Sequence, residues 1–544
     1  MRRTSILIAC FLVSGLARAA DDGEELDKAM NRIRVESFRS SMTFLADDLL
    51  EGREAGTRGY DLAASWVAAQ FEQMGLDAGG TAGYLQPIQF RRSLTVPGES
   101  SMSIRTRGVE RKLVYGRDFY LASNPLRENT VIDADAVFVG FGITSSRPKR
   151  DDYAAVNVQG KIAVIFSGGP ASFSNDERAY YSSSYVKART AAAHGAIGIV
   201  TIRLPSDESR NPWRKLTSRL DKAGMRWVEG EEVGGVVPEI LFQGSVGPSA
   251  VKRLFAASGR DVDALMAGAE KGKTSSFPLK ATLRVRQMSR LKTVTSANVI
   301  GVLPGSDPAL KNEFVTFTAH LDHEGIDASA SGDRVYNGAY DNASGVSALL
   351  EVAKAFRSLP RPPARSVIFL AVTAEEKGLQ GSDYFARHPT VASEQIVANI
   401  NLDMFVAIFP LADVIAFGAE HSSLGGVVQS AAKRVGWQIT SDPFPEEVVF
   451  IRSDQYSFVR QGVPAVFLVN GTKSADPSID GPKLSRQWRR EIYHTKKDDL
   501  SQTFHYPSLV KFARMNLLIG WRVADDPERP RWKEGDFFGQ KLPY

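Results

Sequence analysis

Strand-length and helix-length segments alternate through the second half of the chain, from Asn298 onward. The clearest segment is 366–372, in which every position after the first is apolar, as expected of a strand buried on both faces. This alternation predicts an α/β fold: a mixed sheet with a mostly parallel centre and helices on both faces. The expected strands are 314–319, 366–372, 396–402, 414–418 and 464–469, and the expected helices are 344–356, 379–387, 423–435 and 506–523.

The first half of the chain has a different sequence pattern. Residues 21–113 predict helices at 24–50 and 59–74, and we assign them to the same α/β domain. Residues 114–292 contain short β-rich runs and predict an inserted β-rich domain. Residues 293–544 then form the main domain, which ends in a helix and a tail.

Residues 1–20 predict a signal peptide. They begin with basic residues, continue with an apolar stretch at 6–16, and end in small residues around Ala19. The apolar stretch is too short to span a bilayer, and no other stretch approaches the required length. We therefore expect an exported protein, periplasmic or secreted, with no stable membrane span once the peptide is removed.

Cysteine content and charge exclude several classes of protein. Cys10 is the only cysteine and lies in the predicted signal peptide, so the mature chain has no disulfide, thiolate metal site or cysteine nucleophile. The net charge of +5 over 544 residues is too small for a nucleic-acid-binding surface, and we expect no nucleic-acid partner.

Polar side chains gather where the expected strands of the second half end. In an open α/β sheet, ligands bind outside the carboxyl ends of the strands, so residues from separate segments can meet there. These residues are His320 and Asp322, Asp341, Glu375 and Glu376, and Asp403, with His494 in a later loop as a further candidate.

Histidine combined with several carboxylates suits two divalent cations, and we expect Zn²⁺. Two ions that share one carboxylate need five ligands: one bridge, and one histidine plus one carboxylate for each ion. The predicted metal ligands are His320, Asp341, Glu376, Asp403 and His494.

Two further residues are assigned catalytic roles. Asp322 is expected to bind the second ring nitrogen of His320 and raise the basicity of that ligand. Because two adjacent glutamates do not serve one ion in the same way, Glu375 is assigned as the general base that acts on a metal-bound water.

Five segments together resemble the co-catalytic di-zinc exopeptidases of the bacterial leucyl aminopeptidase type. They are 318–322 (TAHLD), 337–345 (NGAYDNASG), 373–378 (TAEEKG), 401–404 (NLDM) and 493–495 (YHT). The resemblance implies a hydrolase that binds peptide substrates at two Zn²⁺ ions and removes their N-terminal residues.

The predicted insert resembles a protease-associated domain, which is non-catalytic. The residues that carry this resemblance are 152–162 and 193–199. His194 lies in the second of these segments and is therefore given a structural role.

Alternative functions remain open at this stage. The same fold supports carboxypeptidases, for which Arg452 could hold a terminal carboxylate, and glutaminyl cyclases, in which such an insert is unusual. Relatives of transferrin-receptor type keep the fold as binding proteins without the metal site. The oligomeric state is not given by the sequence.

Three residues depart from, or fall outside, the expected pattern. Gln455 stands where this family often has a histidine, which leaves its role in substrate binding open. Tyr340 precedes the predicted bridging aspartate and either narrows the pocket or packs in the core. His323 adjoins Asp322 and could reach the cleft, but we predict that it is not a ligand.

Overall fold

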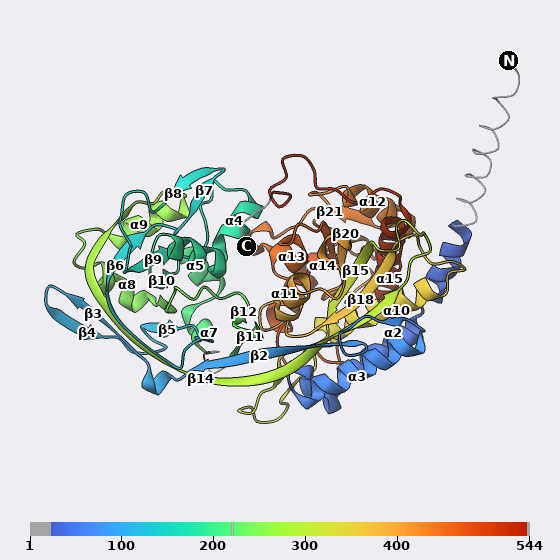
Figure 1. Cartoon of the computed structure of the whole chain (residues 1–544), viewed down its shortest axis with the longest axis horizontal. Helices are drawn as coiled ribbons and strands as arrows, with labels where there is room; N and C mark the ends of the chain where they lie inside the picture. Colours follow the sequence, from blue (N-terminus) through green and yellow to red (C-terminus); the bar gives the residue numbers. More distant parts are fainter. Residues whose placement is uncertain (1–22, 219, 221, 541–544) are drawn as a thin grey trace, which may run out of the picture. The chain divides into compact units, whose positions relative to one another are not determined.

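The computed structural model describes residues 23–218, 220 and 222–540, and the chain forms two compact units (Figure 1). The first unit contains the described residues up to Ile88, residues Thr295–Pro443, and those from Arg452 onward. The second contains Gln89–Val294 and Phe444–Ile451. The predicted signal peptide lies outside the described residues.

A mixed sheet with a parallel centre forms the middle of the first unit, as predicted. Strands β18, β15, β19 and β22 are neighbours and run parallel, whereas β14 and β20 pair antiparallel at either side of them. The strands are β14 (Ser276–Leu303), β15 (Phe314–His320), β18 (Ser366–Val372), β19 (Ile396–Asn401), β20 (Asp413–Phe417), β21 (Gln438–Thr440) and β22 (Ala465–Asn470), with short β1 (Asp77–Ala78) on β14.

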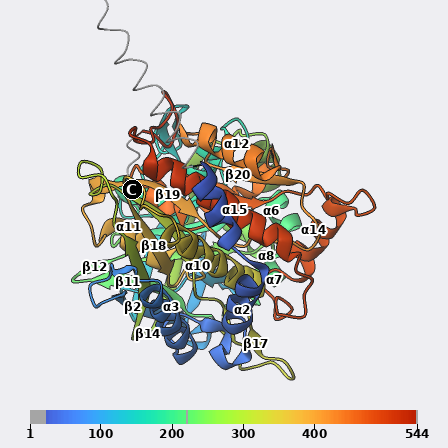
Figure 2. The same ribbon diagram turned by 90° about the vertical axis from the view of Figure 1, so that its right-hand side faces the viewer.

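Both faces of this sheet are buried under helices. Along β18, Val367 and Phe369 join one apolar core, whereas Ile368 and Leu370 join another on the opposite face. This explains the unbroken apolar run in the sequence. Figure 2 shows α2, α10 and α15 in front of the strands, and α11 and α13 contribute to the other core. The helices are α2 (Val35–Leu45), α3 (Arg58–Gln73), α10 (Ser344–Arg357), α11 (Gln380–Arg387), α12 (Leu424–Val435), α13 (Gln455–Val459), α14 (Gly481–Glu491) and α15 (Tyr506–Asp525).

The predicted helix over 24–50 is wrong in its extent. Residues 33 and 34 interrupt it, α2 ends at Leu45, and a 3₁₀ segment, Asp48–Arg53, follows. In that segment Glu51, Gly52 and Arg53 all have positive φ, which an α-helix does not accommodate. A Cβ on Gly52 would lie 2.4 Å from the carbonyl oxygen of Gly325, so a tight approach to another loop dictates this turn.

The second unit has its own apolar cores and a parallel centre, β6, β9, β10 and β13. It begins at Gln89, earlier than the predicted start of the insert at residue 114, and contains more helix than the β-rich runs indicated. Its identity as a protease-associated domain stays a prediction. Its strands include β3 (Ser101–Thr106), β4 (Val109–Lys112), β5 (Phe119–Leu121), β6 (Asn129–Val139), β9 (Ile162–Phe166), β10 (Gly198–Ile202), β11 (Gly224–Glu229) and β13 (Phe242–Val246), and its helices are α4 (Asn175–Ser182), α5 (Ser184–Ala193), α6 (Pro205–Arg210), α7 (Trp213–Thr217), α8 (Pro248–Phe255) and α9 (Val262–Glu270).

Within the described part of the chain, none of the helices combines the length and the apolar character that crossing a bilayer requires.

Candidate metal centre

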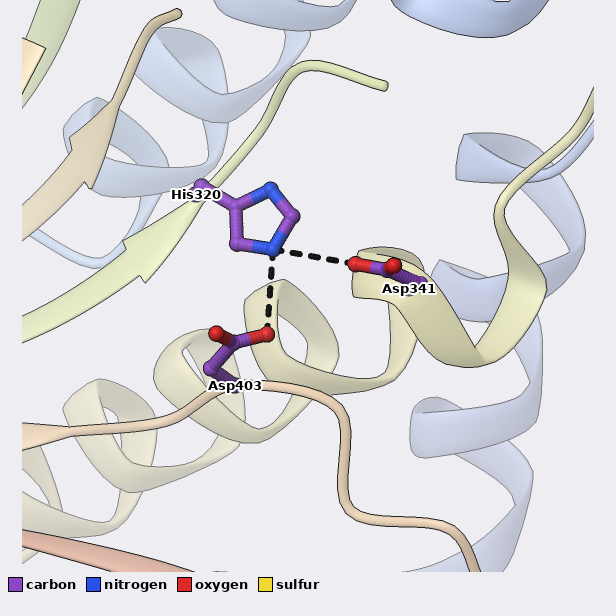
Figure 3. A group of neighbouring side chains, drawn as sticks. All are labelled: His320, Asp341 and Asp403. Carbon is purple, nitrogen blue, oxygen red and sulfur yellow. Dashed lines mark hydrogen bonds and ion pairs between the residues drawn. The ribbon is translucent and has the colours of Figure 1, made fainter. Parts of the chain in front are cut away.

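His320 is the last residue of β15, and two carboxylates meet one of its ring nitrogens. Nε2 of His320 lies 3.1 Å from Oδ1 of Asp341 and 3.0 Å from Oδ1 of Asp403. Figure 3 shows both carboxylates pointing toward that nitrogen from different segments. All three residues are buried, so a shielded group of one imidazole and two carboxylates forms here.

Asp341 also belongs to a second group. Its other oxygen, Oδ2, lies 3.0 Å from Nε2 of His494, and that nitrogen lies 3.3 Å from Oε2 of Glu376. Asp341 therefore stands between the two histidines and offers one oxygen to each. This is the arrangement expected of a bridging carboxylate.

The sheet explains why distant segments meet at this point. Parallel pairing aligns His320 with Val372, the last residue of β18, and Thr318 with Asn401, the last residue of β19. Glu376 and Asp403 follow those strands directly, so they emerge at the same edge as His320. All five predicted ligands are thus brought together, although their role as ligands stays a prediction.

The donor set fits two divalent cations. Each group supplies an imidazole nitrogen and carboxylate oxygens at separations of 3.0 to 3.3 Å, close to the spacing of ligands around one zinc ion. Three buried carboxylates so close together repel one another unless positive charge lies between them. Two cations that share Asp341 would fit the spacing of the donor atoms and would offset the repulsion between the carboxylates.

The predicted contact of Asp322 is wrong in its atoms. Nδ1 of His320 lies 3.1 Å from the main-chain carbonyl oxygen of Asp322, and that carbonyl fixes the imidazole tautomer. The carboxylate of Asp322 instead accepts hydrogen bonds from the backbone amides of Glu375, at 3.0 Å, and Glu376, at 3.3 Å. Asp322 therefore positions the loop that carries both glutamates. Burial raises the pKa of Asp322 to about 6, against the opposing effect of His320.

Glu375 lies beside the ligands without belonging to either group. Burial raises the pKa of its carboxyl well above the usual range; His320 opposes this shift, and the carboxylates of Glu376 and Asp454 add to it. A side chain in this setting is one that can exchange a proton near the metal centre.

Two residues that sequence reasoning missed hold the loop of Asp341. Asp498 is fully buried, and its carboxylate accepts hydrogen bonds from the backbone amides of Tyr340 and Asp341, both at 2.9 Å. Burial raises the pKa of Asp498 to about 6. Asn342 bonds to the backbone of Leu402 at 3.0 Å and of Met404 at 3.1 Å, on either side of Asp403.

Arg53 ties the N-terminal part of the first unit to the same loops. Its fully buried guanidinium donates to the carbonyls of Leu321 at 2.9 Å, Asn337 at 2.6 Å and Gly338 at 3.1 Å, and also to that of Leu45. Burial lowers the pKa of Arg53 to about 10.

Tyr340 and Gln455 have structural roles. The hydroxyl of Tyr340 donates to the carbonyl of Thr503 at 2.7 Å, and its buried ring packs against Trp488 and Phe504. Tyr340 therefore packs in the core and does not narrow a pocket. Gln455 is fully buried and accepts a hydrogen bond from Asn401 at 2.8 Å.

Comparison with known proteins identifies the part of the chain that carries this site. Residues 298–519 match Peptidase family M28. All five predicted ligands lie within this match, and the resemblance to zinc exopeptidases expected from the sequence is confirmed.

Curated relatives agree with this match. The chain is 27% identical over 267 residues to a probable zinc metalloprotease of Pyricularia oryzae, which covers 44% of this chain and 52% of that protein. It is 29% identical over 297 residues to the aminopeptidase YwaD of Bacillus subtilis, covering 53% and 59%. The chain spans about half the length of the curated relatives it matches.

A solved structure confirms the fold over most of the chain. The aminopeptidase from Aneurinibacillus sp. strain AM-1 has a TM-score of 0.54 and 20% identity, and the likeness covers 93% of this chain and 97% of that one. The α/β fold with a mixed sheet, predicted from the sequence, is therefore the fold of a known aminopeptidase.

Proposed function

We propose that this protein is an exported zinc metalloexopeptidase that removes N-terminal residues from peptides at a centre of two Zn²⁺ ions. The observation that carries the proposal is Asp341, which offers one oxygen to the group of His320 and the other to the group of His494. Several relatives are named probable zinc metalloprotease or aminopeptidase, which supports the metal and the reaction class.

The ions, when bound, polarise the scissile carbonyl and lower the pKa of a water molecule at the site toward neutrality. Glu375 accepts the proton of the attacking water and delivers it to the leaving amine. Asp322 keeps Glu375 and Glu376 in place through their backbone amides. Asp341 and the other ligands hold the centre rigid, which keeps the reacting groups aligned.

Metal content and turnover, measured together on the purified protein, test this proposal. We expect about two zinc ions per chain, hydrolysis of free-amine peptides, and no hydrolysis of amino-blocked ones. Glu375→Gln keeps the size of the side chain but cannot accept a proton, so it should retain the metal and lose turnover. Asp413→Asn changes a buried aspartate elsewhere in the same unit and serves as the control.

Other outcomes would redirect the assignment. Cleavage of amino-blocked peptides from the carboxyl end would make the protein a carboxypeptidase. A protein that binds no zinc and cleaves nothing would contradict the enzyme assignment altogether. Full activity in Glu375→Gln would leave the reaction class intact and remove Glu375 as the base.

Export is proposed on the signal-like residues 1–20 alone. Sequencing the N-terminus of the protein recovered from outside the cytoplasm tests it. A mature end near Asp21 would support the proposal, and retention of Met1 in the cytoplasm would contradict it.

A further inference from the structure

His323 lies three residues beyond His320 and faces the second group of ligands. Its side chain is fully buried, and Nδ1 lies 2.7 Å from Oε1 of Glu376. His323, Asp341 and Glu376 each offer a ligand atom within one cluster of metal-binding dimensions. From its sequence position we predicted that His323 is not a ligand, and its place beside Glu376 argues against that prediction.

The polar atoms of His323 have no hydrogen-bond partner within the part of the chain that the structure describes. This holds for both ring nitrogens and also for Oε1 of Glu376. A buried imidazole and a buried carboxylate oxygen that form no hydrogen bond are costly, so such groups in a native protein call for an explanation. Because Nδ1 and Oε1 approach closely without forming a hydrogen bond, one cation between them would satisfy both.

The backbone holds the His323 ring in this position. Gly338 has φ +59°, and a Cβ there would come within 2.6 Å of Cγ of His323, so the ring occupies space that only glycine leaves free. The amide of His323 donates to the carbonyl of Arg53 at 3.2 Å. The rings of His323 and His494 are 6.0 Å apart and nearly perpendicular, with an interplanar angle of 69°.

We propose that His323 is a fourth protein ligand of the ion held by His494, Glu376 and Asp341. This inference rests on the proposed metal centre and deepens it, because it makes the two positions unequal. The ion at His320 has one imidazole and two carboxylates, whereas the ion at His494 has two imidazoles and two carboxylates.

Unequal ligand sets imply unequal affinity. An additional imidazole favours Zn²⁺ over the harder cations Mg²⁺ and Mn²⁺, and one more ligand adds to the binding free energy. We therefore expect the ion beside His494 to bind first and leave last, and the ion beside His320 to exchange more readily.

The test is zinc binding to the metal-stripped full chain, followed by competition with a chromophoric chelator. Wild type should bind in two resolved steps. His323→Ala should weaken the tight step by about tenfold or more and leave the weak step unchanged. His421→Ala changes a buried histidine outside the ligand set and should leave both steps unchanged.

A second variant separates ligation from positioning. If Nδ1 of His323 only donates a proton to Glu376, the amide of His323→Asn can replace it, and full affinity in this variant would overturn the proposal. Unchanged binding in His323→Ala would overturn it too. Circular dichroism of the stripped proteins shows whether each variant folds.

Wild type alone provides a measurement that no folding defect can disturb. With one equivalent of zinc bound, X-ray absorption should detect two imidazole nitrogens on the metal, and a single imidazole would overturn the proposal. These readouts do not depend on turnover. A protein that binds zinc in this way without cleaving peptides would contradict the proposed function and leave the ligand assignment standing.

Discussion

Buried charged side chains have different kinds of partner in the two units. In the second unit, the carboxylate of Asp152 accepts from the amides of Phe141 and Ile143, at 3.0 and 3.1 Å, and pairs with Arg150 at 2.8 Å. Lys187 is buried, and its amine donates hydrogen bonds to the main-chain carbonyls of Phe141 and Phe166. Each of these charges is satisfied by protein groups.

At the candidate metal centre of the first unit, by contrast, carboxylates crowd around histidines. Asp341 and Asp403 share one nitrogen of His320, and Glu376 has an oxygen with no hydrogen bond from the described residues. Buried charge that protein groups satisfy contributes to the fold, whereas buried charge left for a cation indicates a site. Variants of Asp341 in the first unit and of Lys187 in the second distinguish these two cases.

Asp341→Asn should have the largest effect. Without the shared carboxylate, neither ion is held properly, and we expect turnover to fall by about 1,000-fold or more, as several kcal/mol of charge stabilisation are lost. Zinc analysis and kinetics on the same sample check this result. Asp413→Asn should keep its zinc; an Asp341→Asn protein that retains two ions and activity would contradict the bridging role.

Arg53→Leu should destabilise the protein without touching a ligand. Several buried carbonyls lose their donor, and we expect the free energy of unfolding of the metal-stripped protein to fall by about 3 kcal/mol. Zinc affinity should fall as well, since Arg53 holds the carbonyls of Leu321 and Gly338 beside the ligands. Denaturant unfolding and zinc titration measure the two effects. An unchanged zinc affinity would show that the ligand loops keep their conformation without Arg53.

Lys187 should give the second unit a characteristic pH dependence. Burial lowers its pKa to about 7, against 10.5 for an exposed lysine. Between these values the unfolded chain binds a proton that the folded chain does not, so stability should rise with pH by at most about 1.4 kcal/mol per unit. Below about pH 7 both states are protonated, and the contribution is constant.

Unfolding of Lys187→Met at several pH values between 7.5 and 9.5 tests this expectation. Comparison with wild type, both stripped of metal, cancels the titration of the metal centre. The slope that belongs to Lys187 should be absent in the variant. Equal slopes in the two proteins would mean that the buried amine titrates normally.

The smallest effect is expected where the C-terminal tail docks on the first unit. Nδ1 of His421 lies 2.7 Å from Oδ2 of Asp536, and Trp532 donates to the carbonyl of Gly462 at 2.8 Å. His421→Ala should cost about 1 kcal/mol and expose the tail to proteases. Limited proteolysis measures this exposure, with turnover expected to stay near that of wild type.

The site residues that lie just after predicted strands could be predicted from the sequence. An unbroken apolar run such as 367–372 is expected in the middle of a sheet covered on both faces, and the residues after it then lie at the sheet edge. Hence the sequence alone is enough to group His320, Glu376 and Asp403. The sharp turns of Asp48–Arg53 and the polar helix α14 lacked such a pattern and were missed.

The contacts between loops could not be predicted in the same way. Asp498 holds Tyr340 and Asp341 through their backbone amides, and any acceptor of suitable reach could do so. The same limit explains the error about Asp322, whose carbonyl rather than carboxylate lies at His320. Main-chain contacts depend on the path of the loop and leave no residue pattern in the sequence.

Arg53 has a consequence for the order in which the chain assembles. Its guanidinium joins Leu321, 268 positions away, and Gly338, 285 positions away. Contacts between such distant segments require closure of a very large loop and form slowly, after the local structure on each side. The ligand loops therefore reach their final form only when the N-terminal segment of the unit, which ends at Ile88, has met the segment that begins at Thr295. Tight zinc uptake during refolding should lag behind the gain of helical signal, and the metal would then report completed folding.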